Sequence, residues 1–265
     1  MRLNISVSTN VGKVRNNNED NFYANGKELT DGIQDEFSAS YTEEITDTAV
    51  YAVCDGMGGE SCGEVASSTA VRVLGKYRDL ITSAENIKEQ QKTVDAYARA
   101  ASERINEEVH KAGGKRGGTT LTLACIRNNI VSMYYLGDSR IYLYRGGVLT
   151  RLTRDHTVAY DMIDSNVLTE EEADRSPDRH KLTMYLGVDE DTEGLKAGFA
   201  GSYTLTEGDR FLMCSDGLNE MCSKEQIKEI LAAQDENTAR RLVESALENG
   251  GHDNVTCLVI DVAKQ

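Results

Sequence analysis

The sequence is poor in several features that would have restricted its structural class. It contains one proline, no tryptophan and only 6% aromatic residues, and no Ser/Pro-rich linker or low-complexity tract divides it. No stretch approaches the 18 apolar residues of a membrane-spanning helix, and the first residues lack the apolar core of a secretory signal. We therefore expect a single catalytic domain over residues 1–265, located in the cytoplasm and without a membrane partner.

Positive charge is also scarce, with 29 Lys and Arg against 44 Asp and Glu and a net charge of −15. Such a charge repels nucleic-acid backbones and anionic membranes, so we expect no nucleic-acid partner. The six cysteines form no CxxC pair, and in a reducing compartment they stay free thiols. We expect them to act as small apolar residues, with Cys62 the one most open to solvent.

The hydrophobic pattern predicts an α+β fold. Apolar or alternating runs predict strands at 3–8, 49–54, 119–126, 130–136, 140–144, 210–214 and 255–262. Helical spacing predicts a long pair over roughly 63–82 and 89–111 and a shorter C-terminal pair, whose first helix opens with a capping box at Ser223. Strand-rich sequence with hairpin turns such as Arg145-Gly146-Gly147, and helices in pairs, favours antiparallel sheets covered by helices.

The segment 155–181 departs from this pattern. It is polar, contains the single proline, Pro177, and carries a short capping-box signal at Thr169. These features predict a mobile surface flap beside the main body.

Four acidic residues stand at the ends of predicted strands. Asp55, Asp138 and Asp216 each follow a strand, and Asp253 precedes one. Neighbouring antiparallel strands share an edge, so these acids can converge. Carboxylates about 4 Å apart repel by about 4 kcal/mol at an effective dielectric near 20, so such a cluster needs protons or cations. Oxygen ligands suit Mg²⁺ or Mn²⁺, and Gly56 lets the backbone turn sharply at such an ion.

Near the N-terminus, Arg15, Glu19 and Asp20 precede a short apolar stretch. Beside an acidic metal centre, an arginine is the group expected to hold a phosphoryl oxygen. The sequence contains no Cys-x5-Arg loop, no GxSxG elbow and no GxxxxGK[ST] loop. Hydrolysis by metal-activated water is the chemistry that remains.

Taken together, these motifs give a resemblance that runs nearly end to end. They are RNNNED at 15–20, DGMGG at 55–59, GGTT at 117–120, GDSR at 137–140, SDG at 215–217 and HDNVT at 252–256. In this order they resemble the motifs of the metal-dependent protein phosphatases of the type 2C family, in particular the compact bacterial stand-alone members used in signalling. The resemblance implies a central sandwich of two antiparallel β-sheets flanked by pairs of α-helices. It also implies hydrolysis of phosphoserine and phosphothreonine monoesters by direct attack of a metal-bridging water.

The resemblance further implies a centre with two Mn²⁺ or Mg²⁺ ions. Asp55 would bridge both ions and count among the catalytic residues, and Gly56 would give its carbonyl oxygen. Asp216 and Asp253 would complete the coordination of one ion, and Glu19 would hold the other directly or through water.

Other residues follow from the same resemblance. Asp138 with Asp216 would hold a third, weaker ion found in many members. Arg15 would bind the substrate phosphate and, with Asp20, would belong to the catalytic residues. Asp20 and Asn254 would contact the metal-ligating residues rather than the ions themselves. The expected partners are phosphoprotein substrates, a Ser/Thr kinase or its targets, and the expected oligomeric state is a monomer.

One position departs from many eukaryotic relatives. Met57 stands where they carry a histidine credited with protonating the leaving alkoxide. A metal-bound water is the expected donor here, and His156 and His180 in the flap are less favoured alternatives. Three other functions stay open at this point: a two-metal phosphodiesterase or nuclease, an inactive module that binds a phosphoprotein or a divalent ion, and a membrane-tethered signalling component.

Overall fold

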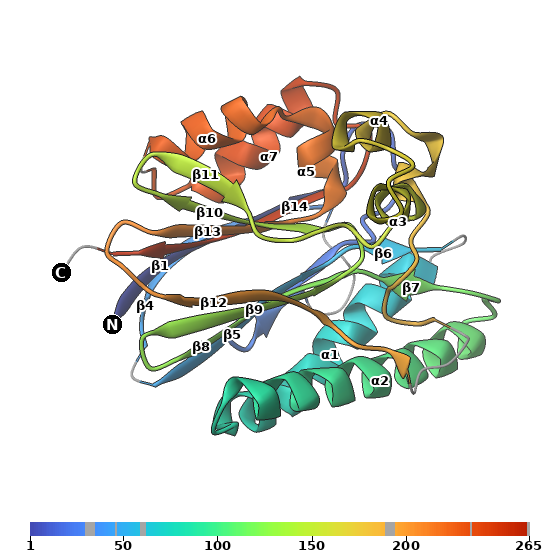
Figure 1. Cartoon of the computed structure of the whole chain (residues 1–265), viewed down its shortest axis with the longest axis horizontal. Coiled ribbons are helices and arrows are strands. Elements are labelled where there is room, and N and C mark those ends of the chain that lie inside the picture. Colours follow the sequence, from blue (N-terminus) through green and yellow to red (C-terminus); the bar gives the residue numbers. More distant parts are fainter. Residues whose placement is uncertain (30–34, 46, 59–61, 189–193, 234, 264–265) are drawn as a thin grey trace.

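Two antiparallel sheets pack face to face, with helices on both outer faces (Figure 1). The computed structural model describes residues 1–29, 35–45, 47–58, 62–188, 194–233 and 235–263. The sheets have strand orders β11-β10-β13-β14-β1-β4 and β12-β9-β8-β5-β2-β3, and β6 pairs with β7 separately. This arrangement confirms the predicted α+β sandwich.

The elements have the following bounds. The first sheet contains β1 (Arg2–Asn10), β4 (Glu36–Glu44), β10 (Arg140–Arg145), β11 (Val148–Arg151), β13 (Arg210–Cys214) and β14 (Val255–Val262). The second contains β2 (Asn21–Ala24), β3 (Lys27–Glu28), β5 (Thr48–Cys54), β8 (Leu121–Arg127), β9 (Ile130–Leu136) and β12 (Gly198–Thr204). The short pair is β6 (Gly56–Met57) and β7 (Gly118–Thr119). The helices are α1 (Cys62–Ser83), α2 (Ile87–Lys111), α3 (Val158–Asp164), α4 (Glu170–Asp174), α5 (Asp216–Met221), α6 (Lys224–Ala232) and α7 (Thr238–Glu248), with a 3₁₀ turn at Pro177–His180.

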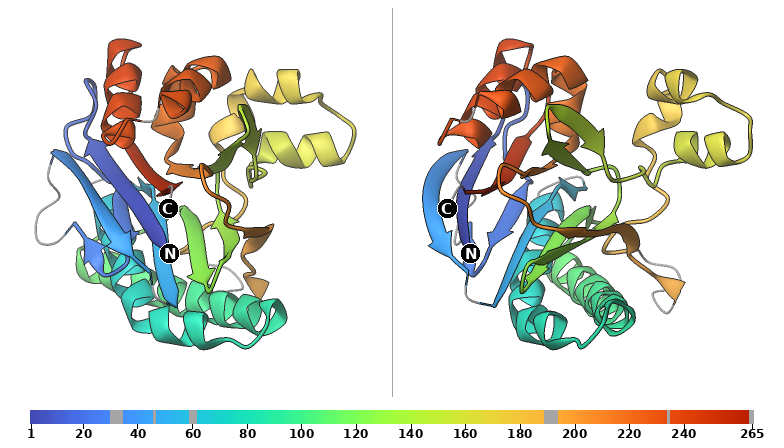
Figure 2. Two further views of the ribbon diagram at one scale, coloured as in Figure 1. Left: turned by 90° about the vertical axis from the view of Figure 1, so that its left-hand side faces the viewer. Right: turned by 60° about the vertical axis from the view of Figure 1, so that its left-hand side comes forward.

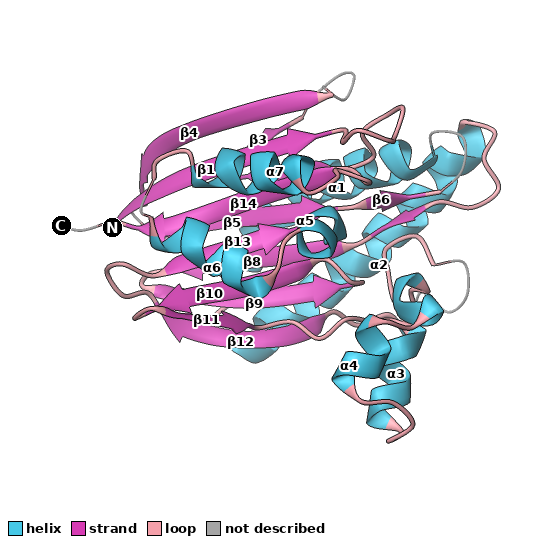
Figure 3. Cartoon of the chain, turned by 90° about the horizontal axis from the view of Figure 1, so that it is seen from above, coloured by secondary structure: helices cyan, strands magenta, loops and turns pink. Residues whose placement is uncertain are grey.

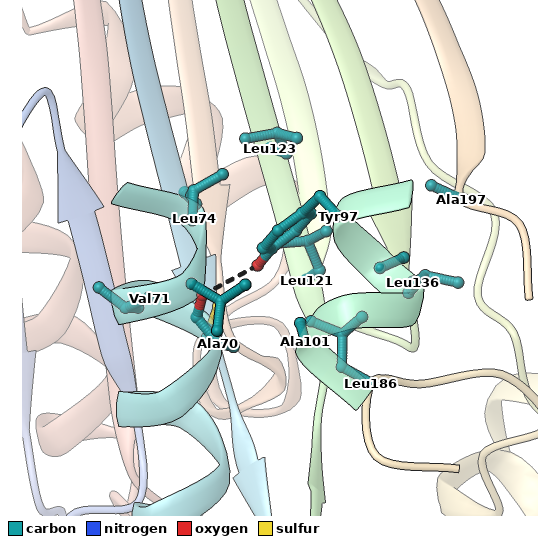
Figure 4. Close-up of a cluster of buried hydrophobic side chains, with 14 of the residues drawn as sticks. Ala70, Val71, Leu74, Tyr97, Ala101, Leu121, Leu123, Leu136, Leu186 and Ala197 are labelled. Atoms are coloured by element: carbon teal, nitrogen blue, oxygen red, sulfur yellow. Dashed lines mark hydrogen bonds between the residues drawn. The ribbon is translucent and has the colours of Figure 1, made fainter. Parts of the chain in front are cut away.

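Three apolar cores hold these layers together. One core lies between the two sheets, a second lies under α1 and α2, and a third lies under α5, α6 and α7. In the second core the Tyr97 hydroxyl donates a hydrogen bond of 3.2 Å to the carbonyl of Ala70, which links α2 to α1 (Figure 4). None of the described helices is both long enough and apolar enough to cross a bilayer.

All seven predicted strands occur, and one of them is divided. The run 119–126 becomes β7 and β8, because the chain leaves the sheet at Thr120. The turn at Gly146-Gly147 joins β10 to β11 with φ of 58° and 81°, which a two-residue hairpin turn requires. The capping boxes at Thr169 and Ser223 are both formed. The pattern missed two long edge strands, β4 and β12, of which β4 is half exposed along its whole length, and the four short strands β2, β3, β6 and β11.

The cysteine prediction is correct except at Cys62. All six cysteine side chains are buried, and none forms a disulfide. Cys62, expected to be the most open, is only 3% exposed, because the loop after α2 lies over it. Gly114 and Gly117 make this close cover possible, since a Cβ at either position would meet Cys62 atoms at 2.3 and 3.0 Å.

The predicted flap region is a helical unit at one end of the sandwich (Figure 2). It contains α3, α4 and the 3₁₀ turn, and Ala159, Tyr160 and Ala173 form a small core of its own. Hydrogen bonds from Val158 N to Lys181 O and from Thr183 N to His156 O close its base. Seen from above, α3 and α4 stand beside the sheets rather than over them (Figure 3).

Candidate metal centre

Strand register brings three of the predicted acids together at the ends of neighbouring strands in the first sheet. Strand β13 pairs with β10 on one side and with β14 on the other, so Cys214 faces both Arg140 and Cys257. Asp138 precedes β10, Asp216 follows β13, and Asp253 precedes β14. All three therefore stand at the same end of neighbouring antiparallel strands, as the sequence predicted.

The second sheet adds the remaining acids. Asn21 at the start of β2 pairs with Cys54 at the end of β5, which places Glu19 and Asp20 beside Asp55. The Gly56 amide donates to the Glu19 carbonyl at 3.1 Å. A Cβ on Gly56 would lie 2.3 Å from the Gly63 carbonyl and 2.4 Å from that of Glu19, so only glycine fits between these two backbone segments.

Thr120 fixes the backbone of Asp55. Its hydroxyl accepts a hydrogen bond of 3.0 Å from the Asp55 amide, and its own amide donates to the Asp55 carbonyl at 2.9 Å. The same hydroxyl lies 2.6 Å from the hydroxyl of Ser139. The break between β7 and β8 thus serves to hold Asp55 in place.

Burial and mutual repulsion act on several of these acids together. Burial raises the pKa of the Asp55 carboxyl well above its usual value, and repulsion from Asp20, Asp216, Asp138 and Asp253 adds to this shift. Asp138 behaves in the same way, with burial first and Asp216 the largest charge effect. Burial raises the pKa of Asp20 to about 7, although the Ser215 hydroxyl donates to it at 2.7 Å.

Arg15 and Asn254 tie the N-terminal loop to the start of β14. The Arg15 guanidinium lies 2.5 Å from the Asp253 carboxylate, and its side chain is 55% exposed. The buried Asn254 side chain accepts from the Glu19 amide at 2.8 Å and donates to the carbonyls of Val11 and Asn17 at 2.9 Å each. Asn254 therefore positions the backbone that carries Glu19.

The donor set fits divalent cations with oxygen ligands. Buried carboxylates that raise one another's pKa are stabilised by cations, and the buried Asp20 Oδ1 has no hydrogen-bond partner among the described residues. In the described part of the chain, three ligand atoms lie within 4.8 Å of one another at Asp138, His180 and Asp216. Asp138, Asp216 and Asp253 all raise the pKa of Asp55, but among the described residues neither Asp55 nor Asp253 belongs to such a group of three ligand atoms. Asp253 instead accepts a hydrogen bond from Arg15.

The flap brings His180, which the sequence indicates only as a less favoured proton donor, to the site. His180 Nδ1 lies 3.8 Å from Asp216 Oδ2, and Nε2 lies 3.1 Å from Glu220 Oε1. The interaction with the Asp216 carboxylate raises the pKa of His180. His156 instead stacks on Tyr135 with 4.8 Å between ring centroids, and burial lowers its pKa. The motif residue Gly59 lies outside the described residues.

Comparison with known proteins gives a consistent result. Residues 29–249 match the model of the family described as "Protein phosphatase 2C". The chain is 34% identical over 262 residues to "Serine/threonine protein phosphatase PstP" of Mycobacterium tuberculosis, covering 98% of this chain and 45% of that protein. It is 29% identical over 267 residues to "Protein phosphatase PhpP" of Streptococcus pneumoniae, covering 99% of each. The chain thus spans about half the length of PstP and nearly all of PhpP.

Solved structures agree with the fold. The crystal structure of the M. tuberculosis phosphatase PstP/Ppp superposes with a TM-score of 0.80 at 32% identity, covering 100% of both chains. The serine/threonine phosphatase of S. agalactiae gives a TM-score of 0.82 at 27% identity, covering 98% of this chain and 99% of that one. The catalytic domain of PstP in complex with two manganese ions gives 0.75 at 32% identity, covering 100% of both.

Proposed function

This chain belongs to the protein phosphatase 2C family, and from that premise we propose that it hydrolyses phosphoserine and phosphothreonine monoesters of proteins with the help of divalent cations. The observation that carries the proposal is the convergence of acids from both sheets. Burial and mutual repulsion raise the pKa values of Asp20, Asp55 and Asp138 together. Such a cluster is unfavourable for stability alone, and divalent cations compensate it.

In this proposal each acid keeps the role expected from its motif. Asp55, the carbonyl oxygen of Gly56 and Glu19 would hold divalent ions from the second sheet. Asp216 and Asp253 would hold one ion from the first sheet, and Asp138 with Asp216 would hold a third. Bound Mn²⁺ or Mg²⁺ supplies the Lewis acidity and the acidified water that two-metal hydrolysis needs.

The remaining roles belong to residues of the chain. Arg15, half exposed beside Asp253, reaches from the rim and binds the phosphoryl oxygens of the substrate. Asp20 and Asn254 position the metal-binding loop from behind, through Ser215 and the Glu19 amide. Met57 has no ionisable group and cannot act as a general acid, so we assign protonation of the leaving alkoxide to water at the site.

The biological setting is part of the proposal. Two relatives carry names of serine/threonine or protein phosphatases, so we assign phosphoproteins as substrates, including a Ser/Thr kinase or its targets. We propose that the chain works as a cytoplasmic monomer, and that residues 1–265 form one catalytic domain with the flap at about 155–181.

The direct test is hydrolysis of a phosphoserine peptide and of p-nitrophenyl phosphate with Mn²⁺, and again with EDTA. We expect activity only with the cation, and Asp216→Asn to lower it by about 10²-fold or more. Asp79→Asn is the matched control, because that carboxylate is 90% exposed on α1. Full activity of Asp216→Asn, or hydrolysis that resists EDTA, would contradict the proposal. A preference for a phosphate diester would indicate a phosphodiesterase or nuclease instead.

A further inference from the structure

Beside the metal centre, a second cavity lies beneath the flap. A cavity of about 600 Å³ contains the acids Asp138 and Asp216, and one of about 720 Å³ lies next to it. Both are lined by Arg140, Tyr160 and Asn219, so the two are adjacent. We call the second one the basic cavity. Its walls come from β10, β11, the flap and the start of α6.

The lining of the basic cavity opposes the charge of the whole chain. It contains four cationic side chains and one acid, in a protein with a net charge of −15. The cations are Arg140, Arg151, Arg154 and Lys224, and the acid is Glu170. A local concentration of cations in an acidic protein is a site where an anionic group can bind despite the long-range field.

Part of this cluster has a structural role. Arg140 and Arg151 share the buried carboxylate of Asp155, so the two cations have one countercharge between them. Arg151 and Arg154 also lie over the ring of Tyr160, 5.0 and 5.3 Å from its centroid, and attach the flap to β11. Flap attachment therefore accounts for Arg154 and for part of the charge on Arg151.

Three groups in the lining are not explained by flap attachment. Lys224 at the start of α6 is exposed and makes no ion pair with any described residue. Arg151 Nε and Asn219 Oδ1 are buried without a hydrogen-bond partner in the described part of the chain. Buried polar groups are normally satisfied, so the unused Arg151 N–H donor indicates a ligand that supplies an acceptor, as an anion does. Asn219 Oδ1 is itself an acceptor, so an anion does not satisfy it.

We propose that the basic cavity is a second anion-binding subsite, which receives another phosphoryl or carboxylate group of the same phosphoprotein substrate. This inference rests on the proposed phosphatase function, because the adjacent cavity must hold the reacting phosphate. Lys224 supplies the free cation, and the arginines supply the positive surroundings. Oxyanions match guanidinium and ammonium donors in charge and geometry. The protein thus selects substrates that carry a second anionic group at a fixed spacing from the reacting phosphoserine.

The test uses a series of phosphoserine peptides that differ only in a second group. That group is a non-hydrolysable phosphonate, a glutamate or a neutral glutamine, placed at increasing spacings from the phosphoserine. We expect the wild-type protein to prefer the anionic peptides at one spacing, by about two- to fivefold in kcat/KM and chiefly through KM. The phosphonate and glutamate peptides distinguish a phosphoryl from a carboxylate ligand.

Lys224→Gln is the informative variant, because Lys224 is exposed and its replacement leaves the flap contacts intact. We expect it to abolish the preference, Lys224→Arg to retain it, and the matched control Lys228→Gln on the same helix to leave it unchanged. Hydrolysis of p-nitrophenyl phosphate should be equal in all four proteins, and its absence in the wild type would refute the phosphatase function itself. Equal preference in Lys224→Gln and wild type, or no preference at any spacing, would overturn the subsite.

Discussion

Replacing Asp20 should stabilise the protein when no cation is bound, at the cost of its activity. Asp20 is fully buried, and burial raises its pKa to about 7. The folded chain therefore favours the protonated acid more strongly than the unfolded chain does. For an acid whose folded pKa is raised, the folded state is most stable at low pH and loses stability as pH rises through the folded pKa.

The magnitude follows from the shift. One pKa unit corresponds to 1.36 kcal/mol, so a rise from 3.8 to about 7 costs about 4 kcal/mol at pH 8 and about 2 kcal/mol at pH 5.5. The difference of about 2 kcal/mol between these two pH values corresponds to about 4–8 °C in Tm for a chain of this size. Asp20→Asn removes the charge while its amide oxygen can still accept from the Ser215 hydroxyl.

Thermal unfolding in EDTA at pH 5.5 and pH 8 measures this effect. We expect the wild-type Tm to fall with pH, and Asp20→Asn to melt higher than wild type at pH 8 with a smaller pH dependence. Asp79→Asn controls for the change in net charge, because that side chain is 90% exposed. A lower Tm for Asp20→Asn at pH 8, or a wild-type Tm independent of pH, would refute the reasoning.

Two further substitutions separate the site from the core. Gly56→Ala should lower phosphatase activity by about 10²-fold, because its Cβ would force apart the backbones of Gly63 and Glu19. An unchanged kcat with Mn²⁺ would show that the close packing of these backbones is unimportant for catalysis. Tyr97→Phe should lower the free energy of unfolding by about 1 kcal/mol through loss of the hydrogen bond to Ala70, and it should leave activity unchanged. Denaturant unfolding measures the free energy. A loss of turnover would contradict the assignment of Tyr97 to the core alone.

The aspartates among the candidate metal ligands could be predicted from the sequence because each stands within two residues of a predicted strand, whereas Glu19 is assigned only through the family resemblance. Asp138, Asp216 and Asp253 follow the register of three neighbouring strands, so the pairing of Arg140, Cys214 and Cys257 fixes where they lie. Antiparallel pairing leaves little freedom at a strand end, and a short tether limits how far the side chain can move.

Other features depend on contacts that no local pattern records. Strand β4 has only Phe37, Ala39 and Tyr41 as apolar residues among polar ones, and they are only partly buried, because the outer edge of this strand has no partner strand. Cys62 is buried by a loop that follows it by about fifty residues, so its own helix position gives no indication of cover. In both cases the decisive interaction is distant in sequence and polar or irregular in composition.

His180 and Lys224 show the same limit at the functional site. His180 belongs to the flap, which has no strand register, and its position beside Asp216 and Glu220 depends on how the flap attaches to the sandwich. That attachment runs through Tyr160, Arg151 and Asp155, and of these Tyr160 and Arg151 also line the basic cavity. The strands therefore fix the acids expected to hold the ions, whereas the flap attachment determines which groups surround the rest of a substrate. Under the proposed function, chemistry and substrate choice are therefore placed on different parts of the fold, so we expect a change in the flap to alter selection without moving the acids.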